Sequence, residues 1–112
     1  MTEEQGGVMG TMELLDLIST DDIESGEATK IERNGLTLAV FRVGDEFYVT
    51  DDLCTHGPGS LSEGCLDGYE IECDCHQGCF DIRTGAVTEA PCTMPLKVYP
   101  TTVREGRVMI EV

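Results

Sequence analysis

Short strand-like segments that contain apolar residues, separated by turn residues, make up the first part of the chain. The segments 30–32, 36–41 and 46–50 are divided by the dipeptides Asn34-Gly35 and Gly44-Asp45. Such dipeptides favour two-residue hairpin loops, because their residues tolerate the positive φ that a tight turn requires. The pattern therefore predicts antiparallel strands joined by hairpins. No helical period extends over three turns anywhere in the chain.

The segment from about 51 to 92 has a different character, since it is rich in Gly, Cys and acidic residues and contains only short apolar runs. Strand-like sequence returns at 96–99 and at 107–112, the latter after the turn dipeptide Glu105-Gly106. We therefore predict an all-β fold of small antiparallel sheets, interrupted by a loop-rich insert. Residues 20–23 are expected to form only a short capped turn.

The first eleven residues are polar, contain Gly6-Gly7 and show no periodicity. We expect residues 1–11 to be a disordered leader and residues 12–112 to form a single domain, as the length of 112 residues suggests.

Charge narrows the possible partners. The chain has 22 acidic against 7 basic residues, a formal net charge of −15, which argues against binding to nucleic acid or to an anionic membrane surface. No apolar stretch approaches the length of a membrane span, and the amino terminus is acidic where a signal peptide would be basic. We therefore expect a cytoplasmic protein without a membrane partner. In that compartment the six cysteines are more often metal ligands or reduced thiols than disulfides.

Both histidines of the chain lie in the insert, and each stands near a cysteine. The first cluster is Cys54-x-His56 and the second is Cys73-x-x-His76, and a glycine follows in each. Glycine lets a backbone curl closely around an inorganic centre and direct its N–H groups at sulfide. Paired Cys/His spacing of this kind predicts a metal site.

Two metals fit this ligand set. Tetrahedral zinc accepts two cysteines and two histidines, although zinc-finger histidine pairs normally come from a helix. Two mixed Cys/His loops can instead place two thiolates on one iron and two imidazoles on another, which is the ligation of a Rieske 2Fe–2S centre.

At these residues the sequence resembles the Rieske-type ferredoxins, the small electron carriers of multicomponent bacterial aromatic-ring-hydroxylating dioxygenases. The resemblance extends from about residue 12 to residue 112. It is carried by the segments 54–57, 61–64 and 83–85 and by Cys73 with His76.

The resemblance implies a Rieske-like fold, with the cluster-binding subdomain at about 51–92, and a Rieske 2Fe–2S cluster. Cys54 and Cys73 are then expected to bind the buried inner iron, and His56 and His76 the outer iron. Two ferric ions, two sulfides and two thiolates sum to zero, so the reduced centre carries one negative charge.

The resemblance also implies a function. The protein is expected to be no enzyme itself, but a one-electron carrier between an NAD(P)H-dependent flavoprotein reductase and a terminal aromatic-ring oxygenase, monomeric between encounters. Both histidines are committed to the cluster, so none remains for a catalytic mononuclear iron. The alternatives are a Rieske-like small subunit of a nitrite reductase-type enzyme and a structural zinc-binding module.

Departures from the high-potential Rieske proteins point to a low potential. Those proteins have a disulfide between the two loops, whereas this chain has Cys75 at one position and Gly59 at the other. They also have serine and tyrosine hydroxyls near the cluster sulfurs, where this chain has Gly78 and Phe80. Losing hydrogen bonds to sulfur lowers the potential, so we predict a value near the bottom of the roughly −150 to +300 mV Rieske range.

Three further features complete the prediction. The four other cysteines are expected to be small, partly buried filler residues, namely Cys65, Cys75, Cys79 and Cys92. Between residues 43 and 82 there are ten acidic residues and no Lys or Arg, which we interpret either as a solvated face that serves solubility or as a surface that steers basic partners. The segment 91–95 resembles the family's proline loop that closes over the cluster, and its sequence is equally compatible with an ordinary surface turn.

Overall fold

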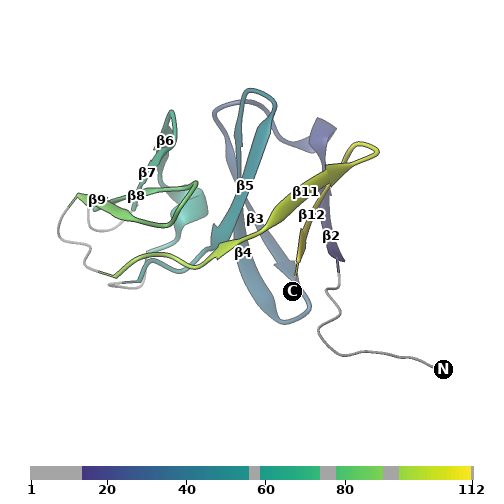
Figure 1. Ribbon diagram of the computed structural model, residues 1–112. Helices are drawn as coiled ribbons and strands as arrows, with labels where there is room; N and C mark the ends of the chain where they lie inside the picture. Colours follow the sequence, from purple (N-terminus) through teal and green to yellow (C-terminus); the bar gives the residue numbers. More distant parts are fainter. Residues whose placement is uncertain (1–13, 56–58, 74–77, 90–93, 112) are drawn as a thin grey trace.

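Three small antiparallel sheets make up the part of the chain that the computed structural model describes, residues 14–55, 59–73, 78–89 and 94–111 (Figure 1). The first sheet has the order β10-β5-β4-β3, with bounds Val98–Tyr99, Glu46–Asp51, Leu36–Val43 and Ala28–Arg33. The second has the order β11-β12-β2, with bounds Thr101–Arg104, Arg107–Glu111 and Leu14–Ser19. The third has the order β6-β7-β8-β9, with bounds Cys65–Asp67, Glu70–Glu72, Cys79–Asp81 and Val87–Glu89.

Helical structure within these ranges is limited to two 3₁₀ turns, η1 (Thr20–Asp22) and η2 (Leu61–Glu63). The Ser19 hydroxyl accepts a hydrogen bond from the backbone N–H of Asp21 (3.1 Å), so η1 is the capped turn that the sequence predicts. The predicted all-β fold of small antiparallel sheets is confirmed.

The predicted hairpin loops are confirmed as well. Asn34 and Gly35 have φ of 55° and 77°, and Glu105 and Gly106 have φ of 53° and 76°. These are the positive values that a two-residue loop needs, and the flanking strands pair in register up to each loop. Gly44 likewise has a φ of 61° in the loop between β4 and β5.

Strand β4 is covered on both faces over residues 38–41, which explains the continuous apolar sequence there. Leu38 and Val40 lie in a cluster between the first and second sheets, whereas Ala39 and Phe41 lie in a cluster beside the third sheet. All four are fully buried. Because neighbouring side chains of a strand point to opposite faces, β4 joins the two cores of the molecule.

The third sheet lies to one side of the other two (Figure 1). Its four strands lie between β5 and β10 in the chain, in the segment that the sequence distinguishes as an insert. The expected leader, residues 1–11, lies outside the described residues. Within the described ranges, no helix is long and apolar enough to cross a membrane.

Candidate metal centre

Two loops of equal length carry the predicted ligands, and the structure closes both with the same hydrogen bond. The backbone N–H of Cys54 donates to the carbonyl oxygen of Gly59 (2.9 Å), and that of Cys73 donates to the carbonyl oxygen of Gly78 (2.8 Å). Each loop is therefore six residues long, starts at a buried cysteine and ends at a buried glycine. His56 and His76 belong to these loops but lie outside the described residues.

The two cysteines are brought into one core. Cys54 and Cys73 are each only 2% exposed, and both belong to the cluster beside the third sheet. Their buried neighbours in it are Ala39, Phe41, Leu61, Ile71, Phe80, Ile82 and Leu96. Two sulfurs in an apolar, water-poor surrounding fit the inner iron of a cluster, because the positive charge of the iron neutralises thiolates that would otherwise be costly to bury.

The described residues alone do not complete a metal site. Among them, no three His, Cys, Asp or Glu side chains lie close enough together to hold a metal ion. The two histidines are therefore needed for a four-ligand centre. The assignment of Cys54, His56, Cys73 and His76 as ligands stays a prediction that fits the donor chemistry of the described pair.

A third segment packs against the first loop. The hydroxyl of Thr55 donates to the carbonyl oxygen of Met94 (2.7 Å), and the N–H of Leu96 donates to the carbonyl oxygen of Gly85 (2.8 Å). Gly85 has a φ of +81°, and a Cβ at this position would lie 2.3 Å from the Leu96 carbonyl oxygen. Only glycine fits such an approach. Residues 91–93 of the predicted proline loop lie outside the described residues.

The packing of residues 61–64 explains why a leucine begins this stretch and a glycine ends it. Leu61 is fully buried in the same cluster as the two cysteines. A Cβ at Gly64 would lie 1.9 Å from the carbonyl oxygen of Glu72, directly before Cys73. The missing side chain lets the segment after the first loop approach the strand that leads into the second loop.

A polar contact joins the third sheet to β5. One carboxylate oxygen of Glu46 accepts hydrogen bonds from the hydroxyls of Tyr69 (2.7 Å) and Tyr48 (2.8 Å), and the two rings meet edge to face. These bonds, that of Tyr69 first, lower the pKa of Glu46. Partial burial and the bond to Glu46 raise the pKa of Tyr48 to about 12, and the bond to Glu46 raises that of Tyr69. The Arg83 guanidinium lies 4.2 Å from the Tyr69 ring centre and pairs with Asp81 (2.9 Å).

The cysteines outside the ligand set differ in exposure. Cys79 is 7% exposed, and burial together with the charges of neighbouring glutamates raises the pKa of its thiol to about 11. For Cys65 the prediction of a partly buried filler is wrong, because its side chain is exposed. The reason is its place at the start of β6, an edge strand of the third sheet, which among the described strands pairs with β7 alone. Cys75 and Cys92 lie outside the described residues.

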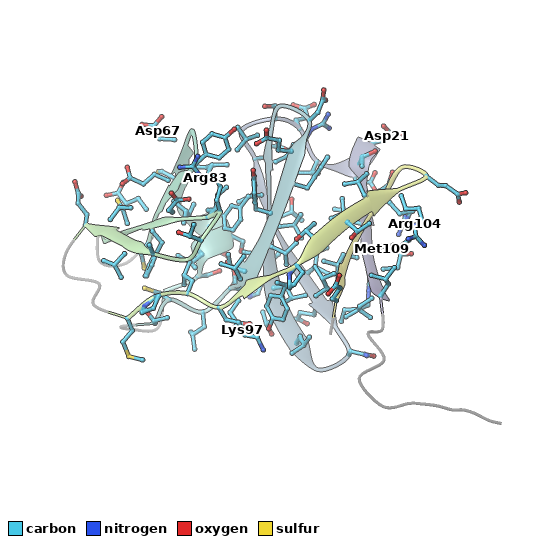
Figure 2. All side chains as sticks on the ribbon, viewed as in Figure 1. Asp21, Asp67, Arg83, Lys97, Arg104 and Met109 are labelled. Atoms are coloured by element: carbon cyan, nitrogen blue, oxygen red, sulfur yellow. The ribbon has the colours of Figure 1, made fainter. Side chains whose placement is uncertain are left out.

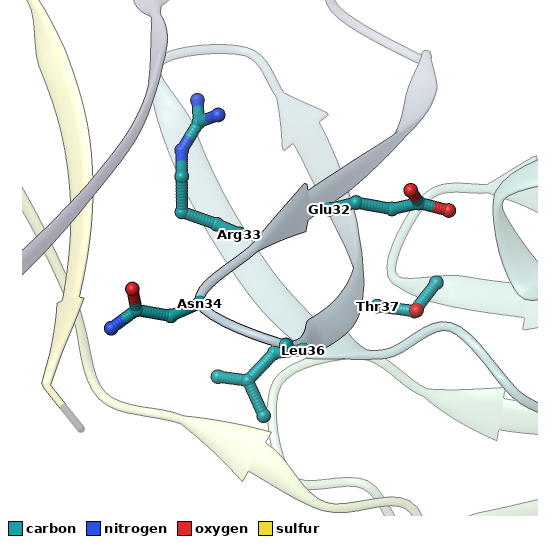
Figure 3. Close-up of a pocket in the computed structure, with 6 residues that line it drawn as sticks. Glu32, Arg33, Asn34, Leu36 and Thr37 are labelled. Atoms are coloured by element: carbon teal, nitrogen blue, oxygen red, sulfur yellow. The ribbon is translucent and has the colours of Figure 1, made fainter.

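A pocket of about 350 Å³ lies at the β3–β4 hairpin and is lined by the consecutive residues 32–37 (Figure 3). Arg33 points from it toward β2, where its guanidinium donates to the carbonyl oxygen of Leu17 (2.7 Å). None of the lining residues is a predicted ligand, so the pocket is separate from the candidate metal centre.

Comparison with known proteins settles the family. The family model described as "Rieske [2Fe-2S] domain" matches residues 13–100, more than half of the chain. The chain belongs to the Rieske family. Its cofactor is thus a Rieske-type 2Fe–2S cluster, as the sequence predicts.

Relatives of this Rieske protein are similar over nearly their whole length. The ferredoxin component of the p-cumate 2,3-dioxygenase system of Pseudomonas putida is 46% identical over 110 residues, covering 94% of this chain and 93% of the relative. The ferredoxin of Sphingomonas yanoikuyae B1 has a TM-score of 0.85 at 42% identity, covering 89% and 99% of the two chains.

Two further structures bear on the role of this Rieske protein. A chain from a complex of reduced oxygenase and oxidized ferredoxin in carbazole 1,9a-dioxygenase has a TM-score of 0.82 at 47% identity, covering 87% of this chain and 91% of that one. A chain described as an NADH-dependent nitrite reductase small subunit from Mycobacterium tuberculosis has a TM-score of 0.80 at 17% identity, covering 91% and 96%. The latter likeness shows a shared fold alone.

Proposed function

We propose that this protein is a one-electron carrier that receives electrons from an NAD(P)H-dependent flavoprotein reductase and passes them to a terminal aromatic-ring-hydroxylating oxygenase. The observation that carries the proposal is the pair of matched loops that begin at buried Cys54 and Cys73. Relatives of nearly the same length are named as ferredoxin components of dioxygenase systems, and a solved structure of one such system is a complex of oxygenase and ferredoxin.

In this proposal the four loop residues hold the cluster. Cys54 and Cys73 supply thiolates from the buried side. His56 and His76 supply neutral imidazoles from within the loops that begin at these two cysteines. When bound, the cluster supplies a centre that accepts and returns a single electron. The chain contains only these two histidines, so a second iron site with two histidine ligands cannot form beside it.

We infer a low reduction potential from the residues around the second loop. Gly78 and Phe80 are both buried, and because neither residue carries a hydroxyl, neither position offers one to the cluster sulfurs. Fewer hydrogen bonds to sulfur stabilise the reduced state less, which lowers the potential.

The surface of the third sheet and of the β5 hairpin favours basic partners. In the segment 43–82 the described acids are exposed or half-exposed with one exception, Asp52. They are Asp45, Glu46, Asp51, Glu63, Asp67, Glu70, Glu72 and Asp81. Asp67 lies near Arg83, which is the first basic residue after this segment (Figure 2). Long-range attraction between an acidic surface and a basic partner raises the rate of small, transient encounters, and this attraction weakens as the salt concentration rises.

The ligand assignment can be tested with matched cysteine variants. The variants C54S, C73S, H56A and H76A should lose the visible absorption and the reduced-state EPR signal of a Rieske centre. C65S serves as the control, because Cys65 is exposed and outside the loops. Two irons and two acid-labile sulfides per chain are expected in the parent protein. A zinc ion without sulfide would instead support the structural zinc module.

The attraction of basic partners by the acidic surface is tested by the salt dependence of reduction. The rate of reduction by a flavoprotein reductase should fall steeply between low and high ionic strength, whereas photoreduction by a neutral deazaflavin should change little. A reductase rate insensitive to salt argues against steering. A stable stoichiometric complex with a larger enzyme on purification would favour the fixed-subunit alternative.

A further inference from the structure

Asp52 is the one charged side chain that is buried among the described residues, with 3% of its surface exposed. Burying a carboxylate is costly unless hydrogen bonds compensate it. One carboxylate oxygen of Asp52 accepts from the Ser60 hydroxyl (2.6 Å) and the other from the Ser62 N–H (2.8 Å). Its backbone N–H donates to the carbonyl oxygen of Thr37 (3.0 Å), and its carbonyl oxygen accepts from the N–H of Leu61 (2.8 Å).

These contacts close the base of the first loop. The chain leaves β5 at Asp51, and the loop that contains Cys54 returns at Ser60, the residue before η2. Ser60 makes no side-chain cap to η2. The carboxylate of Asp52 instead takes up the N–H of Ser62 in that turn and the Ser60 hydroxyl, so it caps η2 from the opposite arm of the loop.

The second loop needs no such group. Its two arms are β7 and β8, which pair in register up to Glu72 and Cys79 directly beside the loop. The arms of the first loop form no ladder in the described residues, but one isolated bridge between Leu53 and Ser60, flanked by two backbone hydrogen bonds. The carboxylate of Asp52 therefore supplies in the first loop the fixation that a sheet ladder supplies in the second.

The charge of this carboxylate has a second consequence. Asp52 precedes Cys54 by two residues, and it is shielded from solvent. Reduction adds one negative charge to the site, and a buried negative charge nearby opposes it because water and salt screen it poorly. The other acids of the segment are exposed or half-exposed, so their charges are screened better.

We propose that Asp52 is a positioning residue that holds the first loop closed and whose fixed charge lowers the reduction potential of the site. This inference rests on the proposed function, because it takes the site to be a redox-active cluster held by Cys54 and its three partners.

Three variants separate the two effects of Asp52. In D52N the amide oxygen can still accept from the Ser62 N–H and the amide nitrogen can donate to the Ser60 oxygen, so the loop is kept and the charge removed. D52A removes both. S60A keeps the charge and removes one hydrogen bond that compensates it. D67N is the control, because Asp67 is an exposed acid at the end of β6 (Figure 2).

The midpoint potential of each holoprotein is measured by voltammetry, with EPR and iron content as the readout of cluster retention. At a fixed ambient potential, D52N should raise the ratio of reduced to oxidised protein on the order of tenfold, about 59 mV for a one-electron couple. D67N should change the ratio by less than about twofold. S60A should shift it in the opposite direction to D52N. With a chelator present, D52A should lose iron several-fold faster than D52N.

Equal potentials in D52N and D67N, or shifts of the same sign in D52N and S60A, would overturn the electrostatic part. Equal iron loss in D52A and D52N would overturn the positioning part. If D52N does not retain a cluster, the direction of the S60A shift decides. Failure of the proposed function is distinct, since the unmodified protein would then itself lack the Rieske EPR signal.

Discussion

Replacing Gly85 by alanine tests whether the segment after the second loop is held as the structure describes. Gly85 has a φ of +81°, a conformation that costs an alanine about 1 kcal/mol. The new Cβ would also lie 2.3 Å from the Leu96 carbonyl oxygen, so that oxygen must recede by about 0.7 Å to reach the 3.0 Å of the closest real contacts.

That displacement has two further costs. It strains the hydrogen bond from the Leu96 N–H to the Gly85 carbonyl oxygen, worth about 1 kcal/mol. It also moves Leu96, which is 5% exposed, within its cluster, for about another 1 kcal/mol. We therefore expect G85A to lower the free energy of unfolding by about 3 kcal/mol.

The assay is equilibrium urea unfolding of the holoprotein, followed by far-ultraviolet circular dichroism and by the visible absorption of the cluster. With a slope of about 1.5 kcal/mol per molar urea, the midpoint should fall by about 2 M. G68A is the matched control, because Gly68 has a φ of +60° but no atom within 4 Å of the added Cβ. It should cost only the backbone strain, about 1 kcal/mol. A G85A midpoint at or above that of G68A would refute the reasoning.

Three more predictions concern the groups around the site. Tyr48 should ionise near pH 12 in an absorbance titration at 295 nm, because burial and the Glu46 carboxylate raise its pKa. An ionisation near the ordinary tyrosine pKa of 10.0 would contradict the contact between Tyr48 and Glu46. Since the folded pKa is the higher one, the stabilisation by this hydroxyl is complete below pH 10 and is lost as the pH rises toward 12, and Y48F should remove this alkaline loss. Iodoacetamide at pH 7.5 should modify Cys65 faster than Cys79, whose thiol is buried with its pKa raised to about 11; mass spectrometry showing the reverse order would mean that β6 is not an exposed edge.

Much of the scaffold could be predicted from local sequence. The hairpin dipeptides Asn34-Gly35 and Glu105-Gly106 specify their turns by φ alone, so the strands on either side are placed without knowledge of the core. The run 38–41 is apolar throughout because β4 is buried there on both faces. The spacing of the Cys/His pairs likewise indicates the two ligand loops before any coordinates are known.

What the sequence did not reveal depends on contacts between distant residues. The exposure of Cys65 follows from the edge position of β6. The sequence of a three-residue strand does not indicate where that strand lies in the order of a sheet. Glu46 and Tyr69 meet across 23 positions of the chain. Asp52 resembles the other acids of its segment, and only its burial and its bonds to Ser60 and Ser62 distinguish it.

The most direct test of the account is the midpoint potential of the purified protein at neutral pH, measured by protein-film voltammetry. A single one-electron wave near the bottom of the roughly −150 to +300 mV Rieske range is the expected result, since Gly78 and Phe80 offer no hydroxyl to the cluster. A wave near the top of that range, or no wave at all, would contradict the proposed low-potential carrier.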